Sequence, residues 1–432
     1  MLRSSMMGAR MSTGGLVGVL LAAGCAASPA PAGPSTGAPS APTNEPPPRP
    51  AEPPAAFPSA QVATLAVDDY ALPVGLARAA DGWTLVLRLD SADALRAVTA
   101  RGGAMRAVPG DMSIGEATVV GIVGGEPPGV VAHRERDGRG GDLVIAGWSG
   151  ALPDAGQAIG ARPWVRTDHV PWFAELRRGY VAWIEHESRP MTRAEQVACS
   201  RHGSCSGSVL LRSRWVVGVV DGTSLTQVPL AWSPGGSLSW IHGALDASGD
   251  LWLGYSERGI RVVHVAGGAA REVGGPLASG GGFVGLLHDG AGPVVVTDVL
   301  SQAPAGAEVV LTLLDAEGGR RGEARAQVAG NATGAIHALA CGGSSWVVMA
   351  PMMGARHEVH ALAFGGDAKL RGRAVVHAAE EPGLAATGSS RASREPVFAC
   401  GGERLAYAFV VPQEQGGWTA VLVEWSSRVP SG

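Results

Sequence analysis

Past residue 60, apolar residues occur in short runs that are separated by turns rich in glycine. The run 83–89 follows Asp81-Gly82, and the run 180–186 follows Arg178-Gly179. Short apolar and aromatic runs bounded by turn residues are typical of β-strands, and amphipathic helical periodicity is hard to find in this part of the chain. The pattern therefore predicts an all-β domain.

This unit of a turn followed by a strand recurs along the whole domain. Two late copies have nearly the same sequence, since Ala340-Cys-Gly-Gly-Ser344 precedes the run 345–350 and Ala399-Cys-Gly-Gly-Glu403 precedes the run 404–410. With weaker copies included, the strands start near residues 83, 129, 180, 251, 293, 345 and 404, a mean step of about 53 residues. A repeat of that length accommodates four short strands and is typical of propeller blades.

The repeat predicts a β-propeller of seven blades, within a range of six to eight, over residues 59–429. Each blade is a small sheet that must bury both faces against its neighbours, which accounts for apolar residues and tryptophan in the copies. A ring of sheets also has to close its open strand edges. The run 61–67 precedes the first blade, and we expect it to supply the outer strand of the last blade, after the run 419–425. A pair of β-sandwiches is the alternative architecture.

One copy, residues 240–259, is more regular than the others. It contains Asp246, Gly249, Leu251, Trp252 and Gly254 in an Asp-x-x-Gly-x-Leu-Trp-x-Gly pattern. This pattern resembles the blade repeat of the sensor-type regulator-propeller family, in which it turns from the inner strand into the second strand. In such a turn Asp246 can accept hydrogen bonds from the turn amides, Gly249 can take a positive φ, and Trp252 can wedge between blades.

The first 25 residues have the three parts of an export signal. A polar stretch with Arg3 and Arg10 precedes a short apolar run, 16–23, and then Gly24-Cys25. The run is too short to span a bilayer as a permanent helix. The segment 21–25 (Leu-Ala-Ala-Gly-Cys) resembles the bacterial lipobox, although Ala22 stands where that motif more often has leucine. The resemblance implies a signal peptide over residues 1–24 and acylation of Cys25; an ordinary secretory signal with an incidental cysteine is the alternative.

Residues 25–58 are predicted to form a lipidated N-terminus followed by a disordered linker. Between residues 26 and 58, 12 of 33 residues are proline, and most of the others are small. Such a composition cannot bury a core and favours extended polyproline II conformations. The segment is therefore interpreted as a spacer between a membrane anchor and the propeller.

Charge excludes some partners and reactions. Without the leader, the chain counts 32 basic and 38 acidic residues, a net charge of −6, which argues against nucleic acid because phosphate binding needs a basic surface. Lys369 is the only lysine. A phosphate-binding loop that ends in Gly-Lys-Ser/Thr is therefore excluded.

Four cysteines lie beyond Cys25, in a compartment where disulfides form. Cys199 and Cys205 enclose five residues and are predicted to staple an insertion loop. Cys341 and Cys400 hold the same place in two consecutive repeats, so a bridge between the last two blades and a pair of buried free thiols are both open.

Three arrangements suggest chemistry at first sight. His357 and His360 are three apart in an extended segment and so face opposite sides of a strand, which rules out a shared metal. Three histidines, at 242, 288 and 337, fall in predicted inner strands, but their distances from the following turns differ, which favours separate roles over one metal or proton-transfer site. No Gly-x-Ser-x-Gly elbow is present: Gly147-Trp-Ser-Gly150 is followed by Ala151, and Gly342-Gly-Ser-Ser345 lies in a predicted hairpin.

No catalytic, cofactor-binding or metal-binding residue is predicted, and the charged segment 186–189 is interpreted as a surface loop. The favoured function is a lipid-anchored, non-enzymatic binding or scaffold propeller of the cell envelope, on the outer membrane or the periplasmic or extracellular face. Its partner would be another envelope protein or polymer. The alternatives are a hydrolase or lyase that acts on an envelope polymer, and an extracytoplasmic sensor component. Two carboxylates, or a histidine with an arginine, close together at the mouth of the central channel would favour the enzyme.

Overall fold

The computed structural model describes residues 60–89, 92–123, 128–135, 141–148, 151–152, 165–167, 175–177, 180–200, 207–221, 224–234, 238–277, 281–300, 307–328, 336–349, 352–353, 356–380, 396–413 and 416–428. All of them belong to one compact unit, Pro53–Gly432. The described residues form 31 strands and one helix, and the strands pair into seven antiparallel sheets. We number the sheets as blades 1 to 7 in chain order.

The first three blades take up the chain as far as residue 234. Blade 1 contains β2 (Ala71–Ala79), β3 (Gly82–Leu89), β4 (Ala94–Arg101), β5 (Ala104–Ala107) and β6 (Met112–Ser113). Blade 2 contains β7 (Thr118–Val123), β8 (Gly129–Glu135), β9 (Gly141–Ala146) and β10 (Val165–Thr167). Blade 3 contains β11 (Glu175–Arg177), β12 (Tyr180–Pro190), β13 (Ser208–Asp221), β14 (Ser224–Pro229) and β15 (Ser233–Pro234), with α1 (Arg193–Ser200) between β12 and β13.

The remaining four blades follow in the same direction. Blade 4 contains β16 (Ser239–Leu245), β17 (Leu251–Ser256), β18 (Ile260–Ala266) and β19 (Ala269–Leu277), and blade 5 contains β20 (Gly282–His288), β21 (Pro293–Leu300), β22 (Ala307–Leu314) and β23 (Arg320–Val328). Blade 6 contains β24 (Ile336–Cys341), β25 (Ser344–Met349), β26 (Met352–Met353), β27 (Arg356–Phe364) and β28 (Leu370–Glu380). Blade 7 contains β29 (Val397–Gly401), β30 (Arg404–Pro412), β31 (Trp418–Ser426) and, from the start of the domain, β1 (Gln61–Val67).

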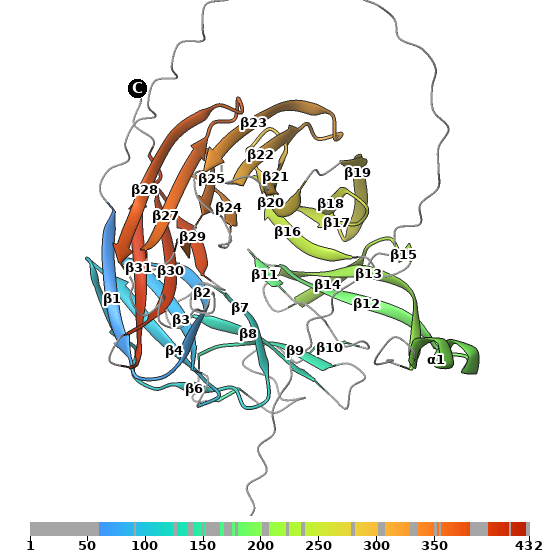
Figure 1. Cartoon of the computed structure of the whole chain (residues 1–432), viewed down its shortest axis with the longest axis horizontal. Helices are drawn as coiled ribbons and strands as arrows, with labels where there is room; N and C mark the ends of the chain where they lie inside the picture. The colour runs from blue at the N-terminus through green and yellow to red at the C-terminus, as the bar shows by residue number, and fades with distance from the viewer. Residues whose placement is uncertain are drawn as a thin grey trace, which may run out of the picture. The chain divides into compact units, whose positions relative to one another are not determined.

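The seven blades form a ring, which confirms the predicted propeller. The first strand of each blade faces the centre in Figure 1, and neighbouring inner strands contact each other, as β20 does with β16 and β24. Each of the seven strand starts expected from the repeat falls within one residue of the start of a second strand: β3, β8, β12, β17, β21, β25 and β30. The alternative of a pair of β-sandwiches is wrong, because the hydrophobic core is divided among several pairs of neighbouring blades around the ring.

Hydrophobic side chains hold the ring together at the faces between blades. Six hydrophobic clusters of described residues each combine side chains from two neighbouring blades. Tryptophans occupy these faces: Trp83 and Trp346 are completely buried, and Trp215 and Trp425 nearly so. Full burial of one large apolar side chain contributes about 1.5–3 kcal/mol. The tryptophans therefore act as core wedges, as the sequence predicts.

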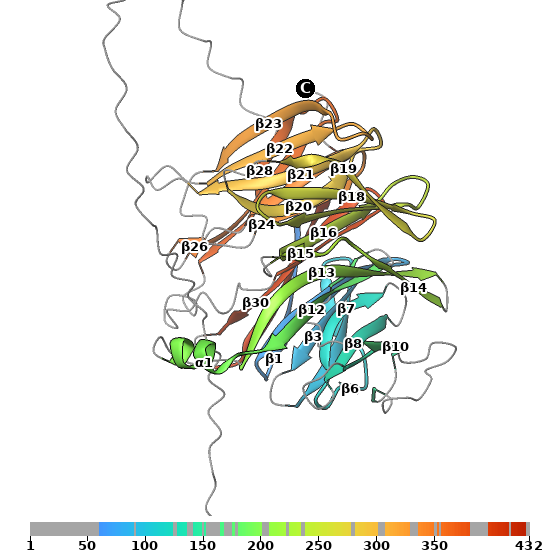
Figure 2. The ribbon, with the colours of Figure 1, turned by 90° about the vertical axis from the view of Figure 1, so that its right-hand side faces the viewer.

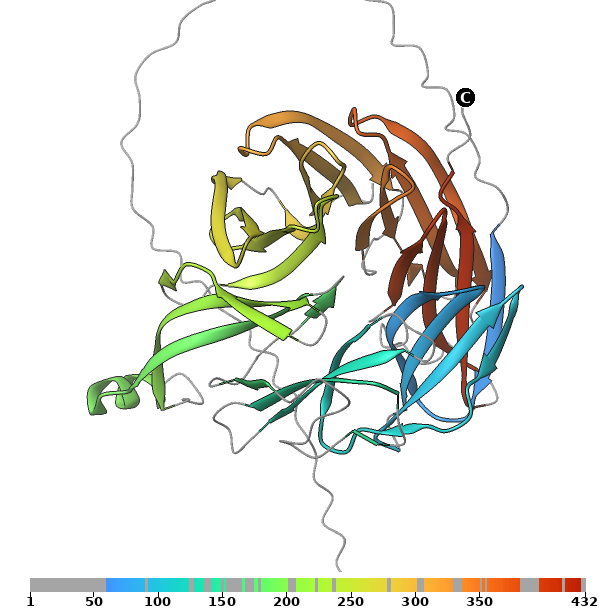
Figure 3. The same cartoon turned by 180° about the vertical axis from the view of Figure 1, so that it is seen from behind.

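The ring closes through a strand from the beginning of the domain. β1 pairs antiparallel with β31 over seven residue pairs, from Gln61 opposite Glu424 to Val67 opposite Trp418. Figure 3 shows this blue strand beside the red strands of blade 7. The closure predicted from the run 61–67 is confirmed.

Glycines let neighbouring inner strands approach each other closely. In β2, β7 and β20 the register shifts by one residue immediately before Gly75, Gly121 and Gly285, so each strand has a β-bulge where it borders the centre. A Cβ atom on Gly75 would lie 2.4 Å from Cγ1 of Ile122, which belongs to the inner strand of the next blade. The missing side chain at Gly75 thus makes room for Ile122.

Gly75→Val is expected to lower the free energy of unfolding by about 1–3 kcal/mol, the usual cost of overpacking. The matched control is Gly275→Val, because Gly275 also lies in a strand, β19, but has no atom within 4 Å of its missing Cβ. Chemical denaturation of both variants measures the difference. Equal stability of the two variants would show that blades 1 and 2 do not pack as described.

One connection departs from the sequence prediction. Residues 186–189 form part of β12 rather than a loop, because the partner strand β13 is equally extended and pairs with them through a bulge after Glu187. His186 Nδ1 and Ser213 Oγ are hydrogen-bonded at 2.8 Å across this pair. The expected surface loop is therefore wrong. Figures 1 and 2 show that α1 follows at the far end of this hairpin, away from the centre of the ring.

Helix α1 begins with a capping box that the periodicity search overlooks. The Thr192 amide donates to Glu195 Oε2 at 2.8 Å, and the Glu195 amide donates to Thr192 Oγ1 at 3.3 Å. Both guanidinium Nη atoms of Arg189 also donate to the Glu195 carboxylate, at 2.7 and 2.9 Å. None of the helix residues is buried, so these polar contacts define the helix start.

Acidification is expected to unfold α1 before the propeller. The hydrogen bonds from Arg189, then those from Thr192, lower the pKa of Glu195 from 4.5 to about 2. Because the pKa is depressed in the folded state, the stabilisation is complete above pH 4.5 and is lost as the pH falls towards 2. Amide hydrogen exchange in α1 should accelerate over that range. In Glu195→Gln, which keeps a capping acceptor but has no carboxylate, the exchange should no longer depend on this titration.

Among the described residues, no helix is long and apolar enough to cross a membrane.

Candidate functional site

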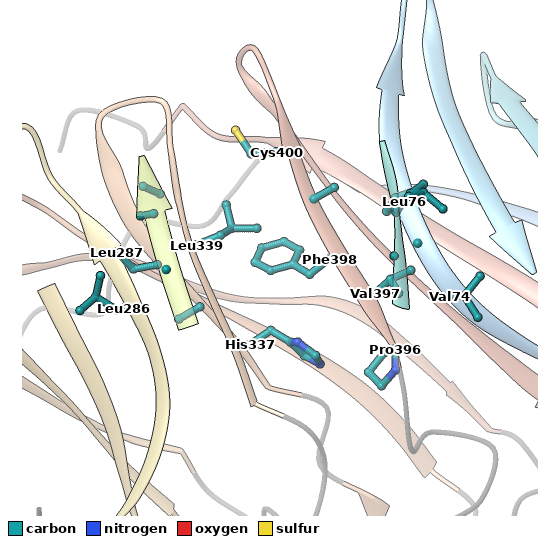
Figure 4. Close-up of a pocket in the computed structure, with 18 residues that line it drawn as sticks. Val74, Leu76, Leu286, Leu287, His337, Leu339, Pro396, Val397, Phe398 and Cys400 are labelled. Atoms are coloured by element: carbon teal, nitrogen blue, oxygen red, sulfur yellow. The ribbon is translucent and has the colours of Figure 1, made fainter. Parts of the chain in front are cut away.

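A cavity of about 360 Å³ lies at the centre of the ring. Its 18 lining residues come from six of the seven inner strands and from Pro396, which immediately precedes β29. Figure 4 shows Phe398 between Leu339 and Val397, with Leu286 and Leu287 on one side and Val74 and Leu76 on the other. The volume falls at the lower end of the range for ligand pockets, about 300–1,000 Å³.

The side chains that line the cavity are mainly apolar, although slightly more than half of its exposed surface is polar. The lining residues are Val74, Gly75, Leu76, Gly121, Ile122, Gly243, Ala244, Leu286, Leu287, His337, Ala338, Leu339, Ala340, Pro396, Val397, Phe398, Ala399 and Cys400. Within this set His337 is the only side chain that can titrate near neutral pH, and none is a carboxylate, arginine or lysine. These lining residues therefore suit an uncharged ligand better than a charged one.

Sequence reasoning missed this cavity, although a signal for it is present. The triplet Val-Gly-Leu/Ile occurs at 74–76, 120–122 and 284–286, and all three copies lie in inner strands that line the cavity. The triplet was missed because a match of three residues is short. The second strands of the blades are more fully buried and show a longer, clearer sequence repeat.

A disulfide joins two inner strands at the wall of the cavity. Cys341 at the end of β24 and Cys400 in β29 are bonded, with their Cα atoms 5.7 Å apart. Of the two outcomes left open by the sequence, the structure contains the bridge between blades 6 and 7. Cys199 is also disulfide-bonded. Cys205 lies outside the described residues, as does Cys25, so the predicted pairing of Cys199 with Cys205 and the acylation of Cys25 remain predictions.

The three inner-strand histidines have separate environments. His242 packs edge-to-face on Phe283 at 5.2 Å between ring centroids, and His288 lies 5.6 Å from Trp252. Burial lowers the pKa of His288, against the opposing effect of nearby carboxylates. His337 alone of the three lines the cavity. The described neighbours of the three histidines therefore differ from one to the next.

The exclusion of a metal at His357 and His360 remains a prediction. His360 lies in β27, and its Nε2 is 2.8 Å from Glu358 Oε2. The side chain of His357 lies outside the described residues. The extended backbone expected for this segment is present.

A cluster of two carboxylates and a histidine lies in the regular copy of the repeat. The potential ligand atoms of Asp246, Asp250 and His264 lie within 4.8 Å of one another. Asp246, however, already accepts hydrogen bonds from the Ser248 amide at 2.9 Å, the Asp250 amide at 3.0 Å and Trp252 Nε1 at 3.1 Å. The cluster therefore stabilises the β16–β17 turn.

This turn has the roles that the sequence assigns to it. Gly249 has a φ of 88°, and Trp252 is 4% exposed in a cluster shared with blade 5. Burial raises the pKa of Asp246, but hydrogen bonds from Ser248 and Trp252 outweigh it and lower the value to about 2. The Asp246 carboxylate is thus charged at neutral pH and fixed by its own turn.

A buried hydroxyl near the cavity has no hydrogen-bond partner among the described residues. Tyr407 in β30 is completely buried, its Oη atom is unpaired, and burial raises its pKa. An unsatisfied buried polar group costs about 1–3 kcal/mol.

Tyr407→Phe is therefore expected to raise the free energy of unfolding by about 1 kcal/mol in chemical denaturation. Tyr407→Ala should instead lower it by about 3–5 kcal/mol through the cavity it leaves; a loss in Tyr407→Phe would mean that the hydroxyl is bonded.

The sequence matches no protein-family model and no curated protein. Among solved structures, it is similar to the β-propeller domain of the trilobed protease from Pyrococcus furiosus, at 8% identity and a TM-score of 0.41 over 84% of this chain and 97% of that one. The polysaccharide lyase Uly1 has 9% identity and a TM-score of 0.43 over 82% and 90% of the two chains. Pyrococcus horikoshii acylaminoacyl peptidase has 9% identity and a TM-score of 0.39 over 79% of this chain, which spans about half (49%) of the peptidase.

Proposed function

We propose that the protein is a lipid-anchored binding propeller of the bacterial cell envelope that performs no chemistry of its own. The central cavity carries this proposal. A hydrolase or lyase needs an acid and a base that converge on the reacting bond, whereas the described lining residues include one histidine and no carboxylate or arginine. A recess lined by apolar side chains at the centre of a ring suits recognition instead.

The leader and the linker support the location. Cys25 follows small residues in a lipobox-like segment, and residues 26–58 provide a proline-rich spacer that keeps the ring away from the membrane surface. The anchor would place the propeller on the outer membrane or on the periplasmic or extracellular face. Its partner would be another envelope protein or polymer.

The binding role is tested by photo-crosslinking in cells. Phe398, at the cavity, is replaced by p-benzoylphenylalanine, and the matched control carries the same group at Leu370, which lies in β28 and is 38% exposed. The proposal expects one discrete adduct from position 398 in the envelope fraction and none from position 370. Labelling of equal strength at both positions, or none at position 398, would refute cavity binding.

The anchor is tested separately. Wild-type protein should incorporate labelled palmitate and sediment with membranes, whereas Cys25→Ala should do neither. Retention of the label in Cys25→Ala would refute acylation at this residue, and the crosslinking result would be unaffected.

A further inference from the structure

The cavity wall is formed unequally by the inner strands. Four consecutive residues of β29, Val397 to Cys400, line it together with the preceding Pro396; β24 also contributes four, and the other inner strands contribute fewer. Successive side chains of a strand point to opposite faces of its sheet. A run of consecutive lining residues therefore means that the edge of β29, and not one face of the sheet, borders the cavity.

That edge carries unused backbone hydrogen-bonding groups. In the described residues β29 pairs with β30 only, over five residue pairs from Val397 opposite Ala408 to Gly401 opposite Arg404. The other edge of such a strand presents a row of N–H and C=O groups. These groups lie in the same recess as Leu339, Phe398 and the other apolar side chains.

The edge is held rigidly. The Cys341–Cys400 bridge fixes one end of β29 to β24. In the middle of the strand, the ring of Phe398 stacks on Trp425 with centroids 5.8 Å apart and meets Tyr407 edge-on at 6.4 Å. A rigid edge avoids the ordering cost that a mobile one would add to binding.

We propose that the cavity binds a short extended segment of an apolar peptide, which pairs as an additional strand with the free edge of β29. This inference rests on the proposed binding function and names its ligand class. A peptide supplies both parts of the match, because its amides satisfy the edge groups and its apolar side chains fill the recess. The four lining residues of β29 span about 13 Å at ~3.3 Å per residue, so a peptide of about four extended residues matches their length.

Other ligands fit less well. An acyl chain has no donors or acceptors, so it would displace water from the edge of β29 and leave the backbone groups unpaired, at about 1–3 kcal/mol for each. A sugar needs several polar side chains for its hydroxyls, and the described lining residues offer His337 alone among titratable groups.

The test uses an equimolar mixture of capped four-residue peptides made from alanine, valine, leucine and phenylalanine. The matched control is the same mixture with every backbone amide N-methylated, which keeps the side chains and removes the donors. Full-length protein is incubated with each mixture, and retained peptides are measured by mass spectrometry after gel filtration. The proposal expects retention of the first mixture and a loss of about tenfold or more after methylation, equal to 1.4 kcal/mol.

Variants then place the binding at β29. Phe398→Ala should reduce retention about tenfold, whereas Leu370→Ala, on the outer strand β28, should retain peptides like the wild type; thermal unfolding confirms that both variants are folded. Equal retention of both mixtures, or of neither, would overturn the proposal. Retention of palmitate in place of peptides would show an acyl-chain cavity. A crosslinked adduct at position 398 together with absent peptide retention would keep the binding function and reject the peptide.

Discussion

Replacing Val67 with aspartate is expected to lower the free energy of unfolding by on the order of 4 kcal/mol. Val67 is 2% exposed and packs in the cluster shared by blades 7 and 1. The substitution removes an apolar contact worth about 1.5–3 kcal/mol and adds the cost of burying a carboxylate. Because β1 closes the ring, the damage falls on the one junction that joins the two ends of the domain.

The strand provides its own control. Val62 lies in β1 too, but on its outer face, where it is 43% exposed. Val62→Asp changes the same charge in the same strand and should alter stability by less than about 0.5 kcal/mol. Chemical denaturation of both variants compares them directly. If both lose the same amount, the pairing of β1 with β31 does not depend on the buried face of β1.

Deletion extends the same argument. A chain that begins at residue 60 keeps β1 and should match the full-length protein in its denaturation midpoint. A chain that begins at residue 68 lacks β1, leaves the edge of β31 exposed and should unfold more readily or aggregate. If the two truncated chains were equally stable, the ring would not need β1 for closure.

The ring could be predicted from sequence because its second strands are almost completely buried. In β3, β25 and β30 most residues that follow the turn are buried, so these strands are rich in apolar residues and each follows a turn that contains glycine. Closure could be predicted because the run 61–67 precedes the first blade and a ring of sheets must close its open strand edges. Strands that are buried on both faces of a blade can therefore be recognised from the sequence by their apolar residues.

The candidate site left a weaker trace in the sequence. Inner strands contain glycine bulges, as at Gly75 and Gly285, which shift the side-chain alternation by one position and shorten the apolar runs. The cavity is also bordered by the edges of strands. The hydrogen-bonding groups at an edge are backbone groups, which nearly all residue types have, so they leave no signal in the sequence. Helix α1 was missed for a related reason: with no buried residue it has no apolar stripe, and only the capping pair Thr192 and Glu195 marks it.

Removal of the Cys341–Cys400 bridge is the second large effect. The cysteines are 59 residues apart in sequence, and in the chain-entropy model a bridge over such a loop stabilises the folded state by about 4 kcal/mol. The double variant Cys341→Ala/Cys400→Ala should lose that amount in chemical denaturation. A smaller loss, about 2 kcal/mol, is expected for Cys199→Ala/Cys205→Ala, because the predicted bond there closes a much shorter loop.

Reduction of the wild-type protein distinguishes the effect of losing the disulfide bond from the effect of changing the cysteine side chains. Wild-type protein in dithiothreitol should fall towards the stability of Cys341→Ala/Cys400→Ala, because both then lack the constraint, whereas Cys341→Ala/Cys400→Ala itself should change only by the contribution of Cys199. The bridge also fixes one end of β29, so the double variant should retain fewer peptides even where it remains folded. If its stability matched that of the wild type, the apolar contacts between blades 6 and 7 would already fix the two strands, and the bridge would contribute nothing to the cavity edge.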